Sequence, residues 1–174
     1  MAHSVEVLFD AATEAVLRGL WDALAAAGLP SQAGHTAPSN RPHATLTVAE
    51  HIDASVDIAL RPTLEHLPLP CVIGAPMLFG GGRTVTLVRL VVPSSELLAL
   101  HDDVHRVCLP HMPNGPLPHA DPGHWTPHVT LARRLAPDRL PAAMAVPDLS
   151  REVEGLITGL RHWDGNAKEE HWIS

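Results

Sequence analysis

PHATL at residues 42–46 and PHVTL at residues 127–131 are two copies of one short pattern, one in each half of a 174-residue chain. A lone His-x-Thr is weak evidence in a chain with 13 histidines. A third case, at residues 124–126, lies in a proline-rich segment, and we assign it to chance or to the rim of a site. The other two cases also share the preceding proline and the following leucine. This match predicts an internal duplication, although the two halves show little similarity elsewhere.

Each copy has the alternation of a β-strand with one polar and one apolar face, because alternate side chains of a strand point to opposite sides. The polar face of the first copy is expected to carry Arg41, His43, Thr45 and Thr47. The polar face of the second copy is expected to carry Thr126, His128 and Thr130. An imidazole with a pKa near about 6.5 can move a proton at neutral pH, and a neighbouring hydroxyl can hold an oxygen atom. Two such pairs could act on one phosphorus atom from two sides.

The duplicated motif and the continuation PHVTLARR at residues 127–134 resemble the 2H phosphoesterase superfamily, which includes 2'-5' RNA ligase-like proteins and cyclic nucleotide phosphodiesterases. The resemblance implies an α+β fold and one bilobal domain over residues 1–174. In that fold two antiparallel sheets with outer helices face each other across a central cleft, related by a pseudo-two-fold duplication. One His-x-Thr strand would come from each lobe.

The resemblance also implies roles for these side chains. His43 would be the general acid that protonates the leaving ribose oxygen, and His128 the general base that activates water. Thr45 and Thr130 would donate hydroxyl groups to the phosphate oxygens, and no metal or other cofactor is required. The expected enzyme is a metal-independent phosphodiesterase for a 2',3'-cyclic phosphate or a related ribose cyclic phosphodiester, on a nucleotide or an RNA end. The reverse chemistry would give 2'-5' RNA ligase activity.

Three further residues are candidates for substrate binding. Arg41 shares the polar face of His43, whereas Arg133 follows the second motif at an odd offset and would point away unless the strand bulges or ends. For both arginines a solvated surface position is the alternative. Trp125 is the candidate for stacking on a base, and a half-buried structural tryptophan is the alternative.

Two other functions stay open from the sequence. One is a catalytically weak module that binds a nucleotide or an RNA end. The other is a zinc protein, because His101 and His105 lie four residues apart on one face of an expected helix and the segment that follows is rich in histidine. No glutamate follows His101, so a solvated helix face is the simpler interpretation of this pair.

Composition narrows the class of protein. Hydrophobic residues make up 45% of the chain and charged residues 18%, which is typical of a globular protein. We expect a cytoplasmic monomer that does not enter membranes, because no apolar run is long enough to span one. The net charge of −7 argues against long duplex nucleic acid as a partner and leaves a small or terminal phosphodiester. Cys71 and Cys108 are expected to be reduced and buried.

The rest of the chain shows alternating strand and helix patterns. The expected strands are residues 4–9, 43–49, 69–79, 84–92, 126–131, 153–161 and 169–173. The expected helices are residues 11–27, 53–67, 94–109 and 137–144. Pro62 should kink or shorten the second helix, and Ser94 or Ser95 should cap the third. Residues 110–127 form the longest irregular segment, of the kind that often carries function.

Overall fold

The seven β-strands within residues 2–174, the part of the chain that this computed structural model describes, form one antiparallel sheet in the order β1-β2-β5-β4-β3-β6-β7. The strands are β1 (His3–Phe9), β2 (His43–Ala49), β3 (Leu69–Phe79), β4 (Val85–Val91), β5 (His128–Leu135), β6 (Val153–Asp164) and β7 (Glu169–Trp172). The α+β class is as expected. The two motifs begin β2 and β5, which are neighbours in the sheet.

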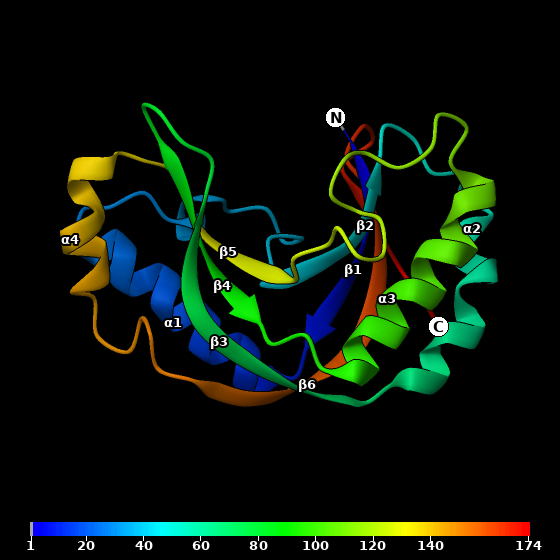
Figure 1. The fold of residues 1–174 in the computed structure, drawn as a ribbon, viewed down its shortest axis with the longest axis horizontal. Coiled ribbons are helices and arrows are strands. Elements are labelled where there is room, and N and C mark those ends of the chain that lie inside the picture. Colours follow the sequence, from blue (N-terminus) through cyan, green and yellow to red (C-terminus); the bar gives the residue numbers. More distant parts are fainter. Residues whose placement is uncertain (1) are drawn as a thin grey trace.

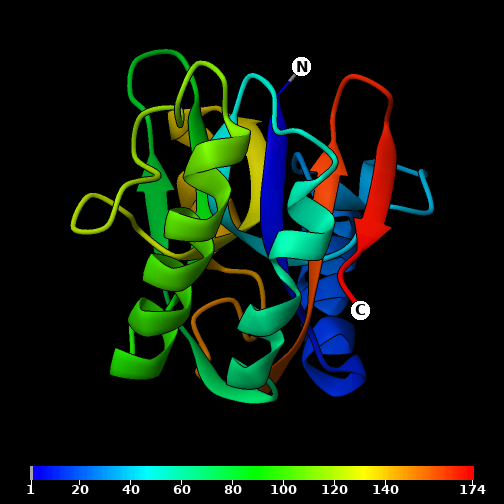
Figure 2. The same cartoon turned by 90° about the vertical axis from the view of Figure 1, so that its right-hand side faces the viewer.

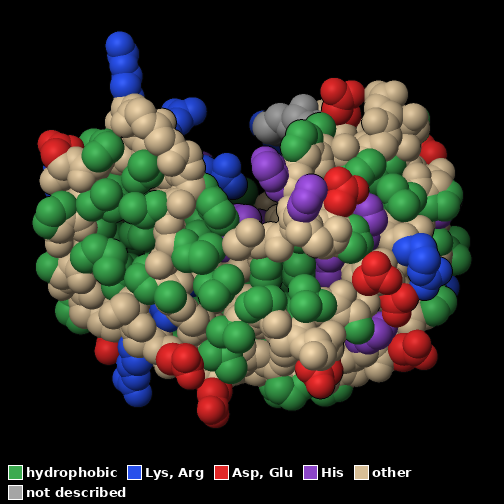
Figure 3. Space-filling view, viewed as in Figure 1, with side chains coloured by type: hydrophobic (Ala, Val, Ile, Leu, Met, Phe, Trp, Pro, Cys, Tyr) green, Lys and Arg blue, Asp and Glu red, His purple; other side chains and the backbone are tan. Residues whose placement is uncertain are grey.

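The expected division into two separate sheets is not confirmed. The strands β2 and β5 pair through Ala44 and Val129, so the two motif strands belong to one sheet. The long strand β6 makes a second link, because residues 153–157 pair with β3 and residues 157–164 pair with β1. Figure 1 shows the result: the strands rise in two groups that are joined at the bottom of the view, and the space-filling view in the same orientation shows a central hollow between the two sides (Figure 3).

The helices lie outside the sheet, on the sides away from the hollow (Figures 1 and 2). They are α1 (Ala11–Ala26), α2 (Val56–Ala59), α3 (Ser95–Cys108) and α4 (Leu140–Met144). Asp10 caps α1 by accepting a hydrogen bond from the Thr13 amide, and Ser94 caps α3 by accepting one from the Leu97 amide, as the sequence predicted for Ser94. The expected helix over residues 53–67 is interrupted, with α2 followed by a 3₁₀ turn at Arg61–His66, because Pro62 has no amide hydrogen to continue it.

Each of the longer helices packs against the motif strand of the other half of the sequence. In one hydrophobic cluster, Leu24 of α1 packs with Leu131 of β5. In the other, Val104 of α3 packs with Leu46 of β2. The two halves of the sequence are therefore joined by packing in the hydrophobic core as well as by strand pairing in the sheet. Cys71 and Cys108 are free, buried thiols, and burial raises the pKa of Cys71 to about 11 and that of Cys108 to about 12.

Both motif strands bulge at the leucine that ends the motif. On β2, Thr45 pairs with Glu6 and Thr47 pairs with Val5, so Leu46 has no partner on β1. On β5, Thr130 pairs with Val88 and Ala132 pairs with Leu87, so Leu131 has no partner on β4. An extra residue of this kind resets the alternation of side chains beyond it.

The bulges bear on two predicted orientations. Thr47 was expected on the face of His43; it lines the central cavity but is buried, with its hydroxyl 3.3 Å from Nδ1 of His105 on α3. The next residue, Val48, lines the cavity as well. By the same reset on β5, Arg133 lines the cavity, although regular alternation would have turned it away.

No helix within residues 2–174 combines the length and the apolar character that crossing a membrane would require.

The bulge leucines should be critical for stability. Leu131 is fully buried, so Leu131→Ala should lower the free energy of unfolding by about 3 kcal/mol through lost apolar contact and the cavity left behind. Urea denaturation followed by circular dichroism measures this change. Leu98→Ala is the matched control, because Leu98 on α3 is 46% exposed and should cost less than about 1 kcal/mol. Equal losses in the two variants would contradict this description of the core.

Candidate active site

One cavity of 1190 Å³ receives side chains from both motifs. Of the residues expected at the site, it is lined by His43, Thr45, Trp125, His128 and Arg133. Figure 3 shows the hollow between the two halves of the molecule, with histidine and basic side chains at its mouth. The two histidines therefore face one space from neighbouring strands, which is the arrangement that acid and base catalysis on one group requires.

Thr130 and Arg41, the other two expected residues, are placed differently. Thr130 is half-buried and is not among the residues that line the cavity. The guanidinium of Arg41 forms an ion pair with Glu14 of α1, with 2.7 Å between Nη2 and Oε2, and lies 5.2 Å from the centre of the Trp172 ring. These contacts hold Arg41 outside the cavity lining.

The two motif histidines are oriented in the same way. Nδ1 of His43 lies 2.6 Å from the carbonyl oxygen of Arg41, and Nδ1 of His128 lies 2.7 Å from that of Thr126. In each case the ring donates its Nδ1 hydrogen to the carbonyl two residues earlier in the chain. This bond fixes the tautomer of the neutral ring, so that Nε2 is the nitrogen that can give or take a proton.

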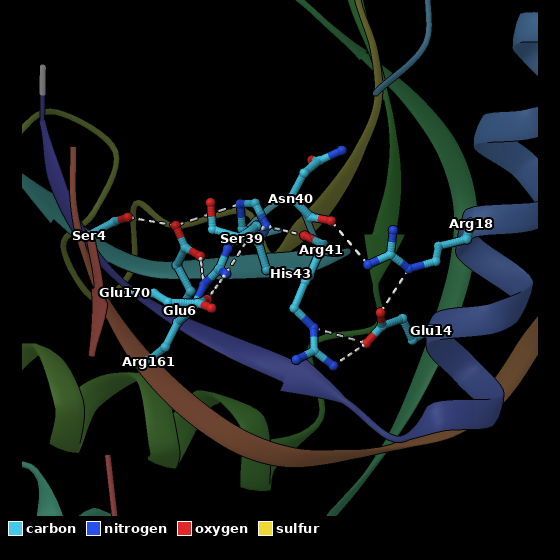
Figure 4. Close-up of polar contacts among 10 residues, drawn as sticks. All are labelled: Ser4, Glu6, Glu14, Arg18, Ser39, Asn40, Arg41, His43, Arg161 and Glu170. Carbon is cyan, nitrogen blue, oxygen red and sulfur yellow. Dashed lines mark hydrogen bonds and ion pairs between the residues drawn. The ribbon is translucent and has the colours of Figure 1, made fainter. Parts of the chain in front are cut away.

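A buried carboxylate lies next to one of these histidines but was not predicted from the sequence. Oε1 of Glu6 on β1 is 3.6 Å from Nε2 of His43 and accepts a 2.6 Å hydrogen bond from the Ser4 hydroxyl. Its other oxygen accepts a 2.8 Å bond from Nε of Arg161 on β6 (Figure 4). Burial acts to raise the pKa of Glu6, but the charges of His43 and Arg161 and these hydrogen bonds outweigh it and leave the pKa below its ordinary value.

His128 has different surroundings. Burial lowers its pKa, and the positive charges of His43 and Arg133 lower it further, while the bond to the Thr126 carbonyl opposes them in part. The ring of Phe79, at the end of β3, meets the His128 ring edge to face at 4.7 Å between centres. These surroundings favour a neutral imidazole at position 128 near neutral pH.

Two tryptophans hold the backbone of the motif threonines. The indole nitrogen of Trp125 donates to the carbonyl of Thr45 at 2.9 Å, and that of Trp21 on α1 donates to the carbonyl of Thr130 at 3.0 Å. Trp125 also stacks on His101 with 3.9 Å between ring centres. It therefore lines the cavity and has a structural role at the same time. The sequence did not single out Trp21, because packing in the core is enough to explain an apolar residue at its position on the helix.

The histidine pair on α3 makes contacts with the irregular segment that follows it. Nε2 of His101 donates to the carbonyl of Ala120 at 3.0 Å, and Nε2 of His105 lies 3.4 Å from a carboxylate oxygen of Asp121. Both rings are buried, so the expectation of a solvated helix face at this pair is wrong. Among residues 2–174, no three His, Cys, Asp or Glu side chains are grouped as a metal ion would need. His101 and His105 therefore connect the rim of the cavity to α3.

Comparison with protein families identifies a match over most of the chain. The model of the 2'-5' RNA ligase superfamily matches residues 12–168. No curated protein sequence matches the chain.

Several solved structures share the fold at low sequence identity. TT0787 of Thermus thermophilus has a TM-score of 0.59 at 16% identity, and the alignment covers 100% of this chain and 96% of that one. Usb1 of Kluyveromyces marxianus has a TM-score of 0.57 at 10% identity, covering 99% and 97%. LigT of E. coli, complexed with 3'-AMP, has a TM-score of 0.54 at 16% identity, covering 98% and 91%.

The buried histidines should make stability depend on pH. Burial lowers the pKa of His3, His101 and His128 below the value of about 6.5 of an unfolded chain, so the unfolded state binds more protons as the pH falls. The stabilising contribution of these neutral, buried histidines to the free energy of unfolding is complete above about pH 6.5 and is lost progressively below it. The free energy of unfolding should therefore fall as the pH is lowered from 7 to 5.

Urea denaturation at a series of pH values measures this dependence. His101→Phe keeps an aromatic ring against Trp125 and removes one titrating group, so its stability should vary less with pH. A free energy of unfolding that stays level or rises as the pH falls through this window would contradict the assignment.

Proposed function

Because the chain belongs to the 2'-5' RNA ligase superfamily of 2H phosphoesterases, we propose that it is a metal-independent phosphodiesterase. Its substrate is a 2',3'-cyclic phosphate or a related ribose cyclic phosphodiester, on a nucleotide or an RNA end. One observation carries this proposal: two imidazoles line one cavity, and each is anchored through Nδ1 so that Nε2 is available for proton transfer.

The proposed reaction uses the two rings in sequence. His128, whose pKa is lowered by burial, takes a proton from water, and the water oxygen attacks phosphorus. His43 gives its proton to the ribose oxygen as the phosphorus–oxygen bond breaks. When a 5'-hydroxyl takes the place of water, His128 takes its proton, the new phosphorus–oxygen bond joins the two ends, and the bond to the 3' oxygen breaks as His43 protonates that oxygen, which is the 2'-5' ligase reaction. The protons are handled by side chains of this chain alone.

The threonines and Arg133 are proposed to hold the phosphate. Thr45 lines the cavity beside His43, and Thr130 lies two residues after His128 on β5, ahead of the bulge, so its hydroxyl shares the side of His128. Arg133 adds a guanidinium that can bond two phosphate oxygens at once. Arg41 is left out of this set, because its guanidinium is paired with Glu14.

The cavity suits a nucleotide or a chain end more than a long polyanion. Its basic lining consists of Arg133, Lys168 and Arg161, and Arg161 is already paired with two carboxylates. Three aromatic side chains line the same space and can contact a base: Phe79, Trp125 and Trp163. The structures of LigT with 3'-AMP and of Usb1 with uridine monophosphate support a nucleotide as the ligand class.

Removing either imidazole should abolish turnover without abolishing binding. His43→Ala and His128→Ala should each lower kcat by about 100-fold to 10,000-fold on 2',3'-cyclic nucleotides, because each removes one proton-transfer step. The assay contains a chelator, and calorimetry with a nucleoside 3'-phosphate measures binding. A wild-type protein that binds the nucleotide but turns over neither cyclic nucleotides, ADP-ribose cyclic phosphate nor 2'-5'-linked oligonucleotides would contradict the proposal and favour the binding module.

The rate should depend on pH in a bell shape. His128 must be neutral to act as base, and its pKa is lowered, so the acidic limb of kcat/KM should lie below about pH 6.5. Initial rates at constant ionic strength between about pH 4.5 and 9 measure the profile. An acidic limb clearly above pH 6.5 would contradict the assignment of His128 as the base.

A further inference from the structure

The two motif histidines differ in the charges that face them, although their backbones are alike. Nε2 of His43 lies 3.6 Å from the carboxylate of Glu6. The charges that act on His128 are those of His43 and Arg133, and both are positive. An imidazolium is therefore stabilised at position 43 and opposed at position 128.

The carboxylate of Glu6 belongs to a network with one net negative charge. Arg161 donates from Nε to Glu6 at 2.8 Å and from Nη1 to Glu170 of β7 at 2.7 Å, so one guanidinium lies between two carboxylates (Figure 4). The same Nη1 donates to the Ser39 carbonyl at 2.8 Å. Nη2 of Arg161 is 3.5 Å from Nδ1 of His43, whereas the carboxylate of Glu6 faces Nε2, the nitrogen available for proton transfer.

Burial makes this network effective and rigid. The side chains of Glu6 and Arg161 are 5% and 3% exposed. In such surroundings charges interact more strongly than in water, and salt screens them little. The hydroxyl of Ser4 bonds the Glu6 oxygen that faces His43, which holds that oxygen in place.

We propose that Glu6 is the positioning residue that keeps the acid proton on His43 and thereby sets His43 as the acid and His128 as the base. This inference rests on the proposed function of the same site. Glu6 is a nearly buried residue of the cavity lining and acts through His43. The Arg41 carbonyl holds the ring of His43 at Nδ1, and Nε2 faces Glu6. The proton that is to be transferred is therefore kept on Nε2, the nitrogen that reacts.

The proton balance follows from this arrangement. Before the reaction His43 carries a proton on both nitrogens, and His128 carries one on Nδ1. During hydrolysis Nε2 of His128 takes the proton of water, the new phosphorus–oxygen bond forms, and the bond to ribose breaks. The leaving oxygen takes the Nε2 proton of His43. Exchange with solvent then returns a proton to His43, favoured by Glu6, and removes one from His128.

The test is Glu6→Gln, which removes the negative charge at nearly the same size: the amide oxygen can accept from Arg161 while the amide nitrogen donates to the Ser4 hydroxyl oxygen. The alkaline limb of the kcat/KM profile should move down by about one pH unit, since a facing opposite charge shifts a titration by about that much or more. Activity at pH 8 should fall about tenfold, while the acidic limb and the affinity for a nucleoside 3'-phosphate stay unchanged. Glu6→Asp keeps the charge and should restore the alkaline limb.

Asp103→Asn is the matched control. Asp103 on α3 pairs with His66 and Arg106 and does not line the cavity, so this variant removes the same charge elsewhere and should leave the profile unchanged. An alkaline limb that stays in place in Glu6→Gln, or that moves equally in Asp103→Asn, would overturn the proposal.

Nuclear magnetic resonance of the histidine ring carbons tests the same proposal without a substrate. At neutral pH in the wild-type protein, His43 should carry a proton on both ring nitrogens and His128 on Nδ1 alone, as the proposal requires. In Glu6→Gln the ring signals of His43 should change toward those of the neutral form, and those of His128 should stay. The reverse arrangement in the wild-type protein would overturn the proposal even if the variant failed to fold. The expected ring signals without turnover of any substrate would instead refute the proposed enzyme activity and leave the role of Glu6 in holding the proton supported.

Discussion

The buried leucine that ends each motif is the constraint on which the site depends. Leu46 and Leu131 have no partner on one neighbouring strand, and each inserts into a hydrophobic cluster that contains a helix from the other half of the sequence. With the leucine anchored in the core, the histidine three residues before it lines the cavity in both motifs. The bulge also resets the strand, so that a different set of side chains faces the cavity beyond it. The same bulge occurs in β2 and in β5, and in each strand it links core packing to the shape of the site.

Much of the site could be predicted from the sequence because strand alternation is a local property. The placement of His43 and His128 in one cavity follows from motif composition, and the cap at Ser94 and the break at Pro62 follow from local chemistry. The bulges at Leu46 and Leu131 could not be predicted, because a bulge depends on pairing with another strand. The single sheet was missed because it depends on the length of β6, which pairs with strands at both ends.

The network under His43 could not be read from the sequence at all. Glu6 and Arg161 are 155 positions apart, and on its own each resembles an ordinary polar position of a strand. Their meeting follows from the pairing of β1 with β6, which aligns them as partners. The repeated motif supplies two imidazoles in similar backbone settings, whereas acid–base chemistry needs two that differ. The added carboxylate on one side, and the apolar ring of Phe79 on the other, supply that difference.

The central claim is that two imidazoles from different halves of the chain act on one phosphate group. A crystal structure of the complex with a nucleoside 3'-phosphate tests it most directly. We expect the phosphate oxygens within hydrogen-bond distance of Nε2 of both His43 and His128, with the hydroxyl of Thr45 on a further oxygen. A phosphate bound elsewhere, or one that contacts a single histidine while the other ring faces away, would contradict the account.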